Sequence, residues 1–318
     1  MPMTIARSDM ETTRSVPQHA GLKVYGALLF SVTAWGASFV AARYVLSSFV
    51  PGMPVLSPVL LATVRFFMAT VVFGVILLFR RPPVERIRRQ DIPALVLLGQ
   101  VGISVYFWLQ YTGLKLTNAS VSSILVVGLI PLATMVVSGL ARRESLRGKR
   151  AAALALGACG VLVVSGQEGL SVALETGFLL GSLCLVANAF CFAVYSTLMR
   201  KMREQYSSLV LTAAVTVSGT AGLLLASAFT QDWSSLLRLE PVQWAAVVYL
   251  SLVCSVLAYF LYNHALSYLE ASKAAVWLYL EPVVAMLLGS LLLGEAISAH
   301  TIAGGAIILL SLTLTQRT

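Results

Sequence analysis

Between Leu116 and Ala141 the chain reads LTNASVSSILVVGLIPLATMVVSGLA, a run of 26 residues without a charged side chain. A helix of about 20 apolar residues is long enough to cross the roughly 30 Å hydrocarbon core of a bilayer. The strands of a membrane β-barrel alternate apolar and polar residues over about ten positions, and this stretch does not. It therefore predicts a transmembrane α-helix.

Nine further segments have the same character, so the predicted fold is an all-α integral membrane protein with ten transmembrane helices. The predicted helices cover residues 23–44, 57–79, 92–112, 117–140, 149–166, 176–199, 207–229, 243–264, 272–293 and 298–315. Residues 1–22 are polar and are expected to form a cytoplasmic tail. The first apolar segment is long enough to span and shows no clear cleavage site, so we expect a retained helix rather than a signal peptide.

The composition excludes other classes of protein. Of the 318 residues, 58% are apolar and 11% are charged, whereas soluble proteins carry about 25% charged residues. A chain this apolar is also not disordered, because disordered chains lack apolar residues. The four cysteines stand singly in apolar stretches, without a CxxC pair or a histidine cluster, so we expect no disulfide, no metal site and no cofactor.

Basic residues are distributed unequally between the two sides that these helices imply. Eighteen fall on the side of the N-terminal tail and the C-terminus, Arg65 lies inside a span, and the opposite side receives only Arg43, Lys115 and Arg238. Basic residues stay on the cytoplasmic side, so both termini are expected there, in the inner or plasma membrane. The basic runs then serve as orientation signals, and no nucleic-acid partner is expected.

The two halves of the chain repeat each other at an offset of about 151 residues. This offset places Pro131 on Pro282 and Glu144 on Glu295, so both halves hold a proline and a glutamate thirteen residues apart. The predicted repeats cover residues 23–166 and 176–315, with five helices each. Because five is odd, the second repeat enters the membrane from the opposite side, an arrangement typical of transporters that work by alternating access.

Five short stretches carry a resemblance to a known family. They are WGASF at Trp35–Phe39, RFF at Arg65–Phe67, LIPLAT around Pro131, LYLEPVVA around Pro282 and GEAIS at Gly294–Ser298. In this order they resemble the drug/metabolite transporter superfamily, specifically its ten-span members with two EamA-type repeats. The resemblance covers residues 23–315, although RRES replaces the usual Gly-Glu at Glu144. It implies ten helices around a central cavity and an exporter or exchanger of small metabolites, often amino acids.

Two charged side chains lie inside predicted helices, where each costs ~2.5–3.5 kcal/mol. Their positions put Arg65 and Glu281 at depths that differ by about 5 Å, given a rise of about 1.5 Å per residue. We expect both to face the cavity, either as an ion pair or as the groups that bind the carboxylate and the ammonium of a zwitterion. A fixed structural ion pair is the alternative. A buried carboxyl such as Glu281 can also carry a proton, which makes protons a candidate coupling ion.

Prolines and deep polar side chains supply the other candidates. Pro131 and Pro282 are expected to kink their helices and expose polar backbone at a gating position, with a mere packing kink as the alternative. The remaining candidates for lining the cavity are Trp35, Tyr106, Trp108, Gln110, Asn188, Tyr259, Trp277 and Tyr279. Tyr111 and Tyr249 lie near helix ends and are expected in the interfacial aromatic belt.

These features predict a transporter of small organic solutes that works by alternating access, and the resemblance implies export of amino acids or related metabolites. A phosphorylated-sugar or nucleotide-sugar exchanger is a second candidate, but it needs several cations in the cavity and only Arg65, with Lys273 at the mouth, is available. An intramembrane enzyme and a channel are further candidates. The chain lacks HExxH, GxSxG and a glycine-rich phosphate loop, so no catalytic residue is assigned. The sequence does not determine the oligomeric state.

Overall fold

The computed structural model describes residues 18–49, 52–79, 86–142, 148–165, 177–202, 205–230, 232–266 and 277–316, and within these ranges all regular structure is helical. The α-helices are α1 (Gln18–Leu46), α2 (Pro58–Phe79), α3 (Ile92–Gly99), α4 (Tyr106–Leu116), α5 (Ala119–Arg142), α6 (Lys149–Ser165), α8 (Phe178–Met202), α9 (Ser208–Thr230), α10 (Pro241–Val248), α11 (Ala258–Leu266), α13 (Leu280–Leu293) and α14 (Ala299–Gln316). Short 3-10 helices, η1 (Arg89–Asp91) and η3 (Trp233–Arg238), precede α3 and α10.

Two of the membrane-crossing helices contain a π-helical segment. The segment η2 (Gln100–Val105) joins α3 to α4, and η4 (Tyr249–Leu257) joins α10 to α11. In η4 the hydroxyl of Ser255 donates to the carbonyl of Leu250 at 3.0 Å, a contact across one wide turn. Such wide turns are frequent at functional sites. The two segments lie about 150 positions apart, at corresponding places in the two halves of the chain.

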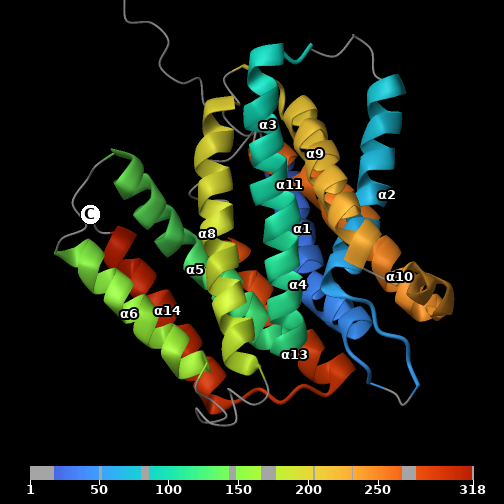
Figure 1. Ribbon diagram of the computed structural model, residues 1–318. Helices are drawn as coiled ribbons and strands as arrows, with labels where there is room; N and C mark the ends of the chain where they lie inside the picture. Colours follow the sequence, from blue (N-terminus) through green and yellow to red (C-terminus); the bar gives the residue numbers. More distant parts are fainter. Residues whose placement is uncertain are drawn as a thin grey trace, which may run out of the picture.

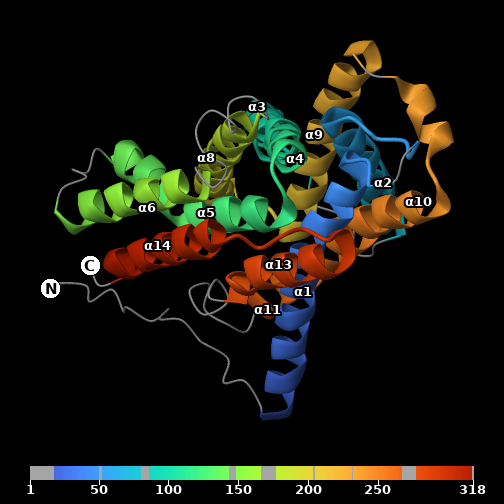
Figure 2. The ribbon, with the colours of Figure 1, turned by 90° about the horizontal axis from the view of Figure 1, so that it is seen from below.

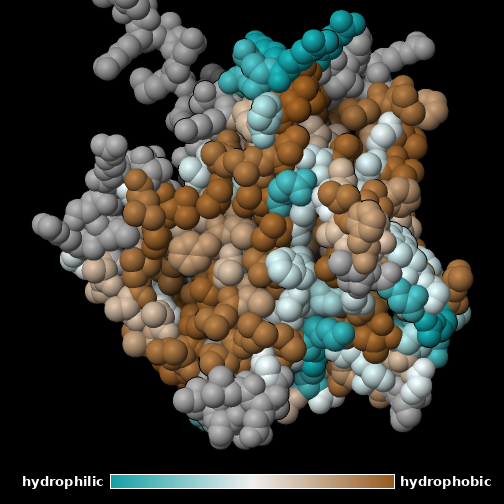
Figure 3. Space-filling view, viewed as in Figure 1, coloured by the Kyte–Doolittle hydropathy of each residue, from teal (hydrophilic) through white to brown (hydrophobic). Residues whose placement is uncertain are grey.

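The length and the apolar surface of the described helices are those of a membrane protein. Seven of them are long and apolar enough to cross a bilayer, and three shorter apolar helices cover Ala151–Val164, Leu280–Leu293 and Ala299–Ser311. Large apolar side chains point outward, among them Phe67, Leu225 and Leu292. Figure 3 shows apolar side chains over the middle of one face and hydrophilic ones gathered at its upper end and lower right. Soluble monomers rarely expose so large an apolar area, so the chain is a multi-pass membrane protein.

The predicted helix ranges agree with the structure to within a few residues, except at the ninth. There residues 277–278 are helical, Tyr279 forms a turn, and α13 runs on from Leu280. Residues 267–276, which include the predicted start of this helix, lie outside the described part of the chain.

The same turn bears on the prediction for Pro282. The helix breaks at Tyr279, three residues before Pro282, where the missing N–H of a proline leaves the carbonyl of Leu278 without its helical partner. A gating role of Pro282 stays a prediction. Pro131 lies inside α5, as predicted.

Helices from the two halves of the chain pack against each other. The most extensive contacts join α6 to α14, α5 to α8, α4 to α8, α1 to α13 and α2 to α9. Figure 1 shows α6 and α14 paired at one edge of the molecule, and Figure 2 shows the same pair from below. Glycines allow this approach: a Cβ atom on Gly304 would lie 2.7 Å from the carbonyl oxygen of Gly160. Close packing through small residues is what holds helices together in lipid.

Candidate functional site

Arg65 is the centre of a buried polar cluster. Only 4% of the surface of this residue is exposed, and its guanidinium binds groups from two other elements. Nε donates to Oγ of Ser255 in η4 at 2.8 Å, and Nη1 donates to the hydroxyl of Tyr111 in α4 at 2.6 Å. The guanidinium also lies 4.6 Å from the ring centroid of Phe107 and 5.2 Å from that of Phe66. These contacts hold a cation in place without a carboxylate.

Glu281 is the second buried charge, in the first turn of α13. It is 8% exposed, and within the described part of the chain no hydrogen bond or ion pair reaches its carboxylate. The helix α1 passes very close at this point, since a Cβ on Gly36 would lie 2.8 Å from the carbonyl oxygen of Glu281. A buried charge without a partner is costly, and inside a membrane it marks a functional site.

The two charges share neighbours without touching each other. The described residues contain no ion pair between Arg65 and Glu281. Both charges nevertheless interact electrostatically with the same three side chains, those of Tyr106, Tyr259 and Cys254. The predicted alternative of a direct structural ion pair is therefore wrong for this structure. Tyr106 and Tyr259 are thus near both a fixed cation and a carboxyl that has no partner among the described residues.

Trp35 in α1 closes this cluster on one side. Its Nε1 donates to the carbonyl of Cys254 at 3.0 Å, and its ring lies 5.1 Å from those of both Tyr259 and Tyr262, measured between centroids. The tryptophan thus fixes α1 against η4 and α11. Trp35 packs against Tyr259, which lines the cavity described below, but Trp35 is not among the described lining residues, so its predicted role in lining the cavity stays a prediction.

A small cavity adjoins the arginine. Its volume is about 40 Å³, room for a few water molecules at most, so a solute fits only after the helices move. It is lined by Phe66, Gly102, Ile103, Tyr106, Phe107, Phe192, Tyr195, Thr212, Val215, Thr216, Ser255 and Tyr259. Three of these residues, Phe66, Phe107 and Ser255, also contact Arg65. None of the lining residues that the structure describes is Asp, Glu, Lys, Arg or His.

Two predicted amides lie beside the cluster. Nδ2 of Asn188 donates to the carbonyl of Tyr106 at 2.7 Å, and Gln110 follows Tyr106 by one turn of α4. Both amides are buried, and neither Oδ1 of Asn188 nor Oε1 of Gln110 has a hydrogen-bond partner among the described residues.

Three predicted residues lie away from this cluster. Trp108 is 49% exposed, because it stands on the opposite side of α4 from the buried Tyr106 and Gln110 and points out of the bundle. Trp277 packs near the start of α1, with its ring 5.8 Å from that of Tyr25. Tyr279 packs against the main apolar core, and among the described residues no hydrogen bond or ring contact joins it to Arg65 or to the partners of Arg65.

The sequence reasoning missed several residues. Tyr111 was expected in the aromatic belt, but it is 2% exposed and binds Arg65. Tyr249 was also expected there, and its hydroxyl instead donates to the carbonyl of Ala34 at 2.8 Å. Ser255 carried no signal, because one serine in an apolar stretch is common. For Tyr111, the spacing of four residues from Phe107 was a usable signal, since it places both rings on one helix face.

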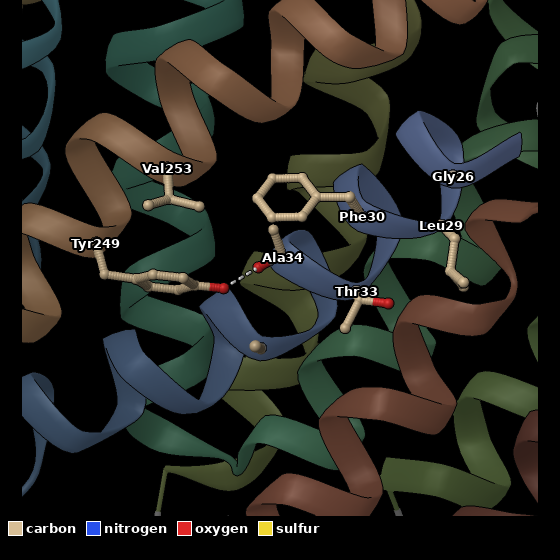
Figure 4. A pocket seen from close by; sticks show the side chains of 8 residues that line it. Gly26, Leu29, Phe30, Thr33, Ala34, Tyr249 and Val253 are labelled. Carbon is tan, nitrogen blue, oxygen red and sulfur yellow. Dashed lines mark hydrogen bonds between the residues drawn. The ribbon is translucent and has the colours of Figure 1, made fainter. Parts of the chain in front are cut away.

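A larger hollow of about 390 Å³ opens on the outside of the bundle, between α1 and η4. Figure 4 shows Phe30 and Val253 facing each other across it, with the hydrogen bond from Tyr249 to Ala34 at its edge. Its lining is apolar, and Leu29 and Phe30 are exposed. It faces the surroundings of the helices and is separate from the charged cluster.

Comparisons with known proteins point to one family. The pattern of the EamA-like transporter family matches the chain twice, over residues 22–166 and 179–317. An S-adenosylmethionine/S-adenosylhomocysteine transporter of Chlamydia muridarum is 29% identical over 82% of this chain and 81% of its own. A probable terminal-alkyne amino-acid exporter of Streptantibioticus cattleyicolor is 26% identical over 93% and 94%. A crystal structure with 22% identity has a TM-score of 0.58 and covers 93% of this chain and 96% of the other, which shows a shared fold.

Replacing Tyr111 with Phe removes the hydroxyl that accepts from Arg65. Hydrogen bonds to charged groups contribute about 1.5–3 kcal/mol, so we expect Tyr111→Phe to lower the melting temperature of the purified protein by several degrees. Tyr44→Phe is the control, because Tyr44 stacks on Phe49 without a hydrogen bond in the described residues. Equal melting temperatures for the two variants would contradict the assigned role of Tyr111.

Proposed function

Because the chain belongs to the EamA-like transporter family, we propose that it exports small zwitterionic solutes of the amino-acid class by alternating access. The observation that carries this proposal is the pair of opposite charges, Arg65 and Glu281, which are buried beside the same tyrosines and are not paired with each other. The family itself supports transport across a membrane. The choice of solute comes from the site.

A zwitterion supplies what each charge lacks. A guanidinium binds a carboxylate through parallel N–H groups, and Nη2 of Arg65 has no partner in the described residues. An ammonium in turn supplies donors and a positive charge to the carboxylate of Glu281. The solute's two charges then neutralise both protein charges in a site that excludes water, where electrostatic attraction is strong.

The small cavity suggests the kind of side chain the solute carries. It adjoins Arg65 and is lined by aromatic and aliphatic groups with a few hydroxyls. An uncharged, apolar side chain loses little on entering such a pocket, whereas a charged one leaves its water without gaining a partner. We therefore assign amino acids with neutral, apolar side chains as the solute class.

The names of two relatives agree with the amino-acid part of this proposal, although the side chain of S-adenosylmethionine carries a sulfonium charge and is not apolar. One is named as a transporter of S-adenosylmethionine and S-adenosylhomocysteine, and the other as a probable exporter of terminal-alkyne amino acids. These solutes share an α-amino group and an α-carboxylate. That shared part is what Arg65 and Glu281 would bind.

We propose ten membrane spans in two inverted repeats, with both termini in the cytoplasm. The two family matches, over 22–166 and 179–317, support the duplication. The helix contacts support the symmetry: an offset of about 150 residues turns the pair α1–α13 into α8–α5, and maps α2–α9 and α6–α14 onto themselves. The hydroxyls of Thr70 and Thr220, 150 positions apart, meet at 2.8 Å.

The other candidate functions have less support. A phosphorylated solute requires several cations, and Arg65 is the one cation that contacts the lining of the cavity in the described residues. An enzyme would need reactive groups in that lining besides hydroxyls and phenols. Glu281 is the candidate for carrying a proton, with facilitated diffusion as the alternative.

Removing either charge should stop transport. We expect Arg65→Gln and Glu281→Gln each to lower leucine uptake into proteoliposomes by roughly tenfold or more, since each removes charge-assisted contacts with the solute. Arg238→Gln is the matched control, because Arg238 forms an exposed ion pair with Asp232. Unchanged uptake by both site variants, at equal protein content, would refute the assignment of the site.

Enlarging the cavity should change which side chains are accepted. Phe192 lines the cavity, whereas Phe190 on the same helix is exposed. We expect Phe192→Ala to raise transport of phenylalanine relative to alanine, and Phe190→Ala to leave this ratio unchanged. Competition assays with lysine and aspartate complete the test: inhibition as strong as that by leucine would contradict a neutral pocket.

A further inference from the structure

Glu295 belongs to the GEAIS stretch and takes no part in the central site. It follows α13, which ends at Gly294 in the left-handed conformation with φ of 67°. This turn lets the Glu295 N–H donate to the carbonyl of Gly289 at 3.2 Å. The carboxylate folds back over Gly289, where a Cβ would lie 2.9 Å from Oε2. Two glycines thus place one carboxylate against the end of its own helix.

The Glu295 carboxylate reaches two other helices. The N–H of Ala119, the first residue of α5, donates to its two oxygens at 3.0 and 3.2 Å. Nε of Arg43, near the end of α1, lies 3.4 Å from Oε1. The start of a helix has free N–H groups and a partial positive charge, so a carboxylate binds well there. Burial raises the pKa of Glu295, and the N–H of Ala119 and the charge of Arg43 oppose that rise.

Arg43 extends the network to a fourth helix. Its Nη1 donates to the carbonyls of Leu114 and Lys115, at the end of α4, at 2.9 and 2.5 Å. One carboxylate and one guanidinium therefore join the ends of α1, α4, α5 and α13. We call the network of Glu295, Arg43, Ala119, Leu114 and Lys115 the clasp.

The clasp lies at the same end of the helices as Lys115, the side assigned above to the outside of the cell. Three of the helices it joins also carry the central site: α1 holds Trp35, α4 holds Tyr106 and Tyr111, and α13 holds Glu281. Separation of these helix ends is the direct way to open the site outward. The ends cannot separate while the clasp is formed.

We propose that the clasp is the outer gate of the transporter, closed in this structure and broken each time the central site opens to the outside. This inference rests on the proposed function. The geometry fits a reversible contact, since the side chains of Arg43 and Glu295 keep 18% and 9% of their surface exposed. They lie at the helix ends, where water replaces each lost hydrogen bond, unlike Arg65 in the bundle centre.

Cys254 is a natural reporter of outward opening. It is fully buried beside Trp35 and the carbonyl of Ala34. In a chain with Cys159, Cys184 and Cys191 replaced by Ala, a membrane-impermeant maleimide added outside right-side-out vesicles reaches Cys254 only through an open outer side. We expect Glu295→Gln to speed this labelling roughly tenfold, the effect of losing one charge-assisted contact that exists in a single state.

Asp232→Asn is the matched control for Glu295→Gln. Asp232 forms an exposed ion pair with Arg238 on the same proposed side of the membrane, so its loss should leave Cys254 labelling unchanged. Equal labelling rates in the Glu295→Gln and Asp232→Asn variants would overturn the gate. Labelling needs no solute, so it reports on the gate even when the chain transports no amino acid and the proposed function fails.

A cross-link separates a gate from a permanent structural contact. With the native cysteines replaced by Ala, Arg43→Cys and Glu295→Cys are joined by a short bis-methanethiosulfonate reagent. We expect the cross-link to stop leucine transport and a reductant to restore it. Full transport by the cross-linked protein would show that these ends never separate, and would overturn the proposal.

Discussion

A charge in the middle of a bilayer has to be stabilised by the protein around it, and the centre of this molecule is organised by that constraint. Arg65 is stabilised by a phenol, a hydroxyl and two aromatic faces from three elements. Glu281 has no such stabilising contact within the described residues. The helices that carry these groups must converge closely. The site that results contains a cation held by its neighbours and a carboxyl that has no partner among the described residues.

Small residues make the convergence possible. Gly36 lets α1 lie against α13 at Glu281, and Gly304 lets α14 lie against α6. Without a hydrophobic driving force between helices in lipid, such close packing supplies much of the cohesion. An offset of about 150 residues relates the pair α1–α13 to the pair α8–α5, and the π-helical segment η2 to η4. A bundle built from the two inverted repeats proposed above would have two nearly equivalent arrangements of its halves, which is what alternating access requires.

The helices and the two charges could be predicted because hydropathy and the cost of a membrane charge are local properties of the sequence. The surroundings of those charges could not. A transmembrane helix is apolar on every side, so nothing local shows that Tyr111 turns inward while Trp108 turns outward. Nearness to a helix end suggested an interfacial role for Tyr111, and packing against Arg65 overrides it. The break at Tyr279 and the clasp at Glu295 depend on contacts between distant segments.

Counterflow tests the central claim most directly. Proteoliposomes loaded with unlabelled leucine are diluted into buffer with a trace of labelled leucine, and the label inside is followed over time. A carrier that binds a zwitterion between Arg65 and Glu281 and alternates between two sides predicts a transient accumulation of label above its outside concentration. Label that only equilibrates, with a rate proportional to leucine concentration at all concentrations, would contradict the account.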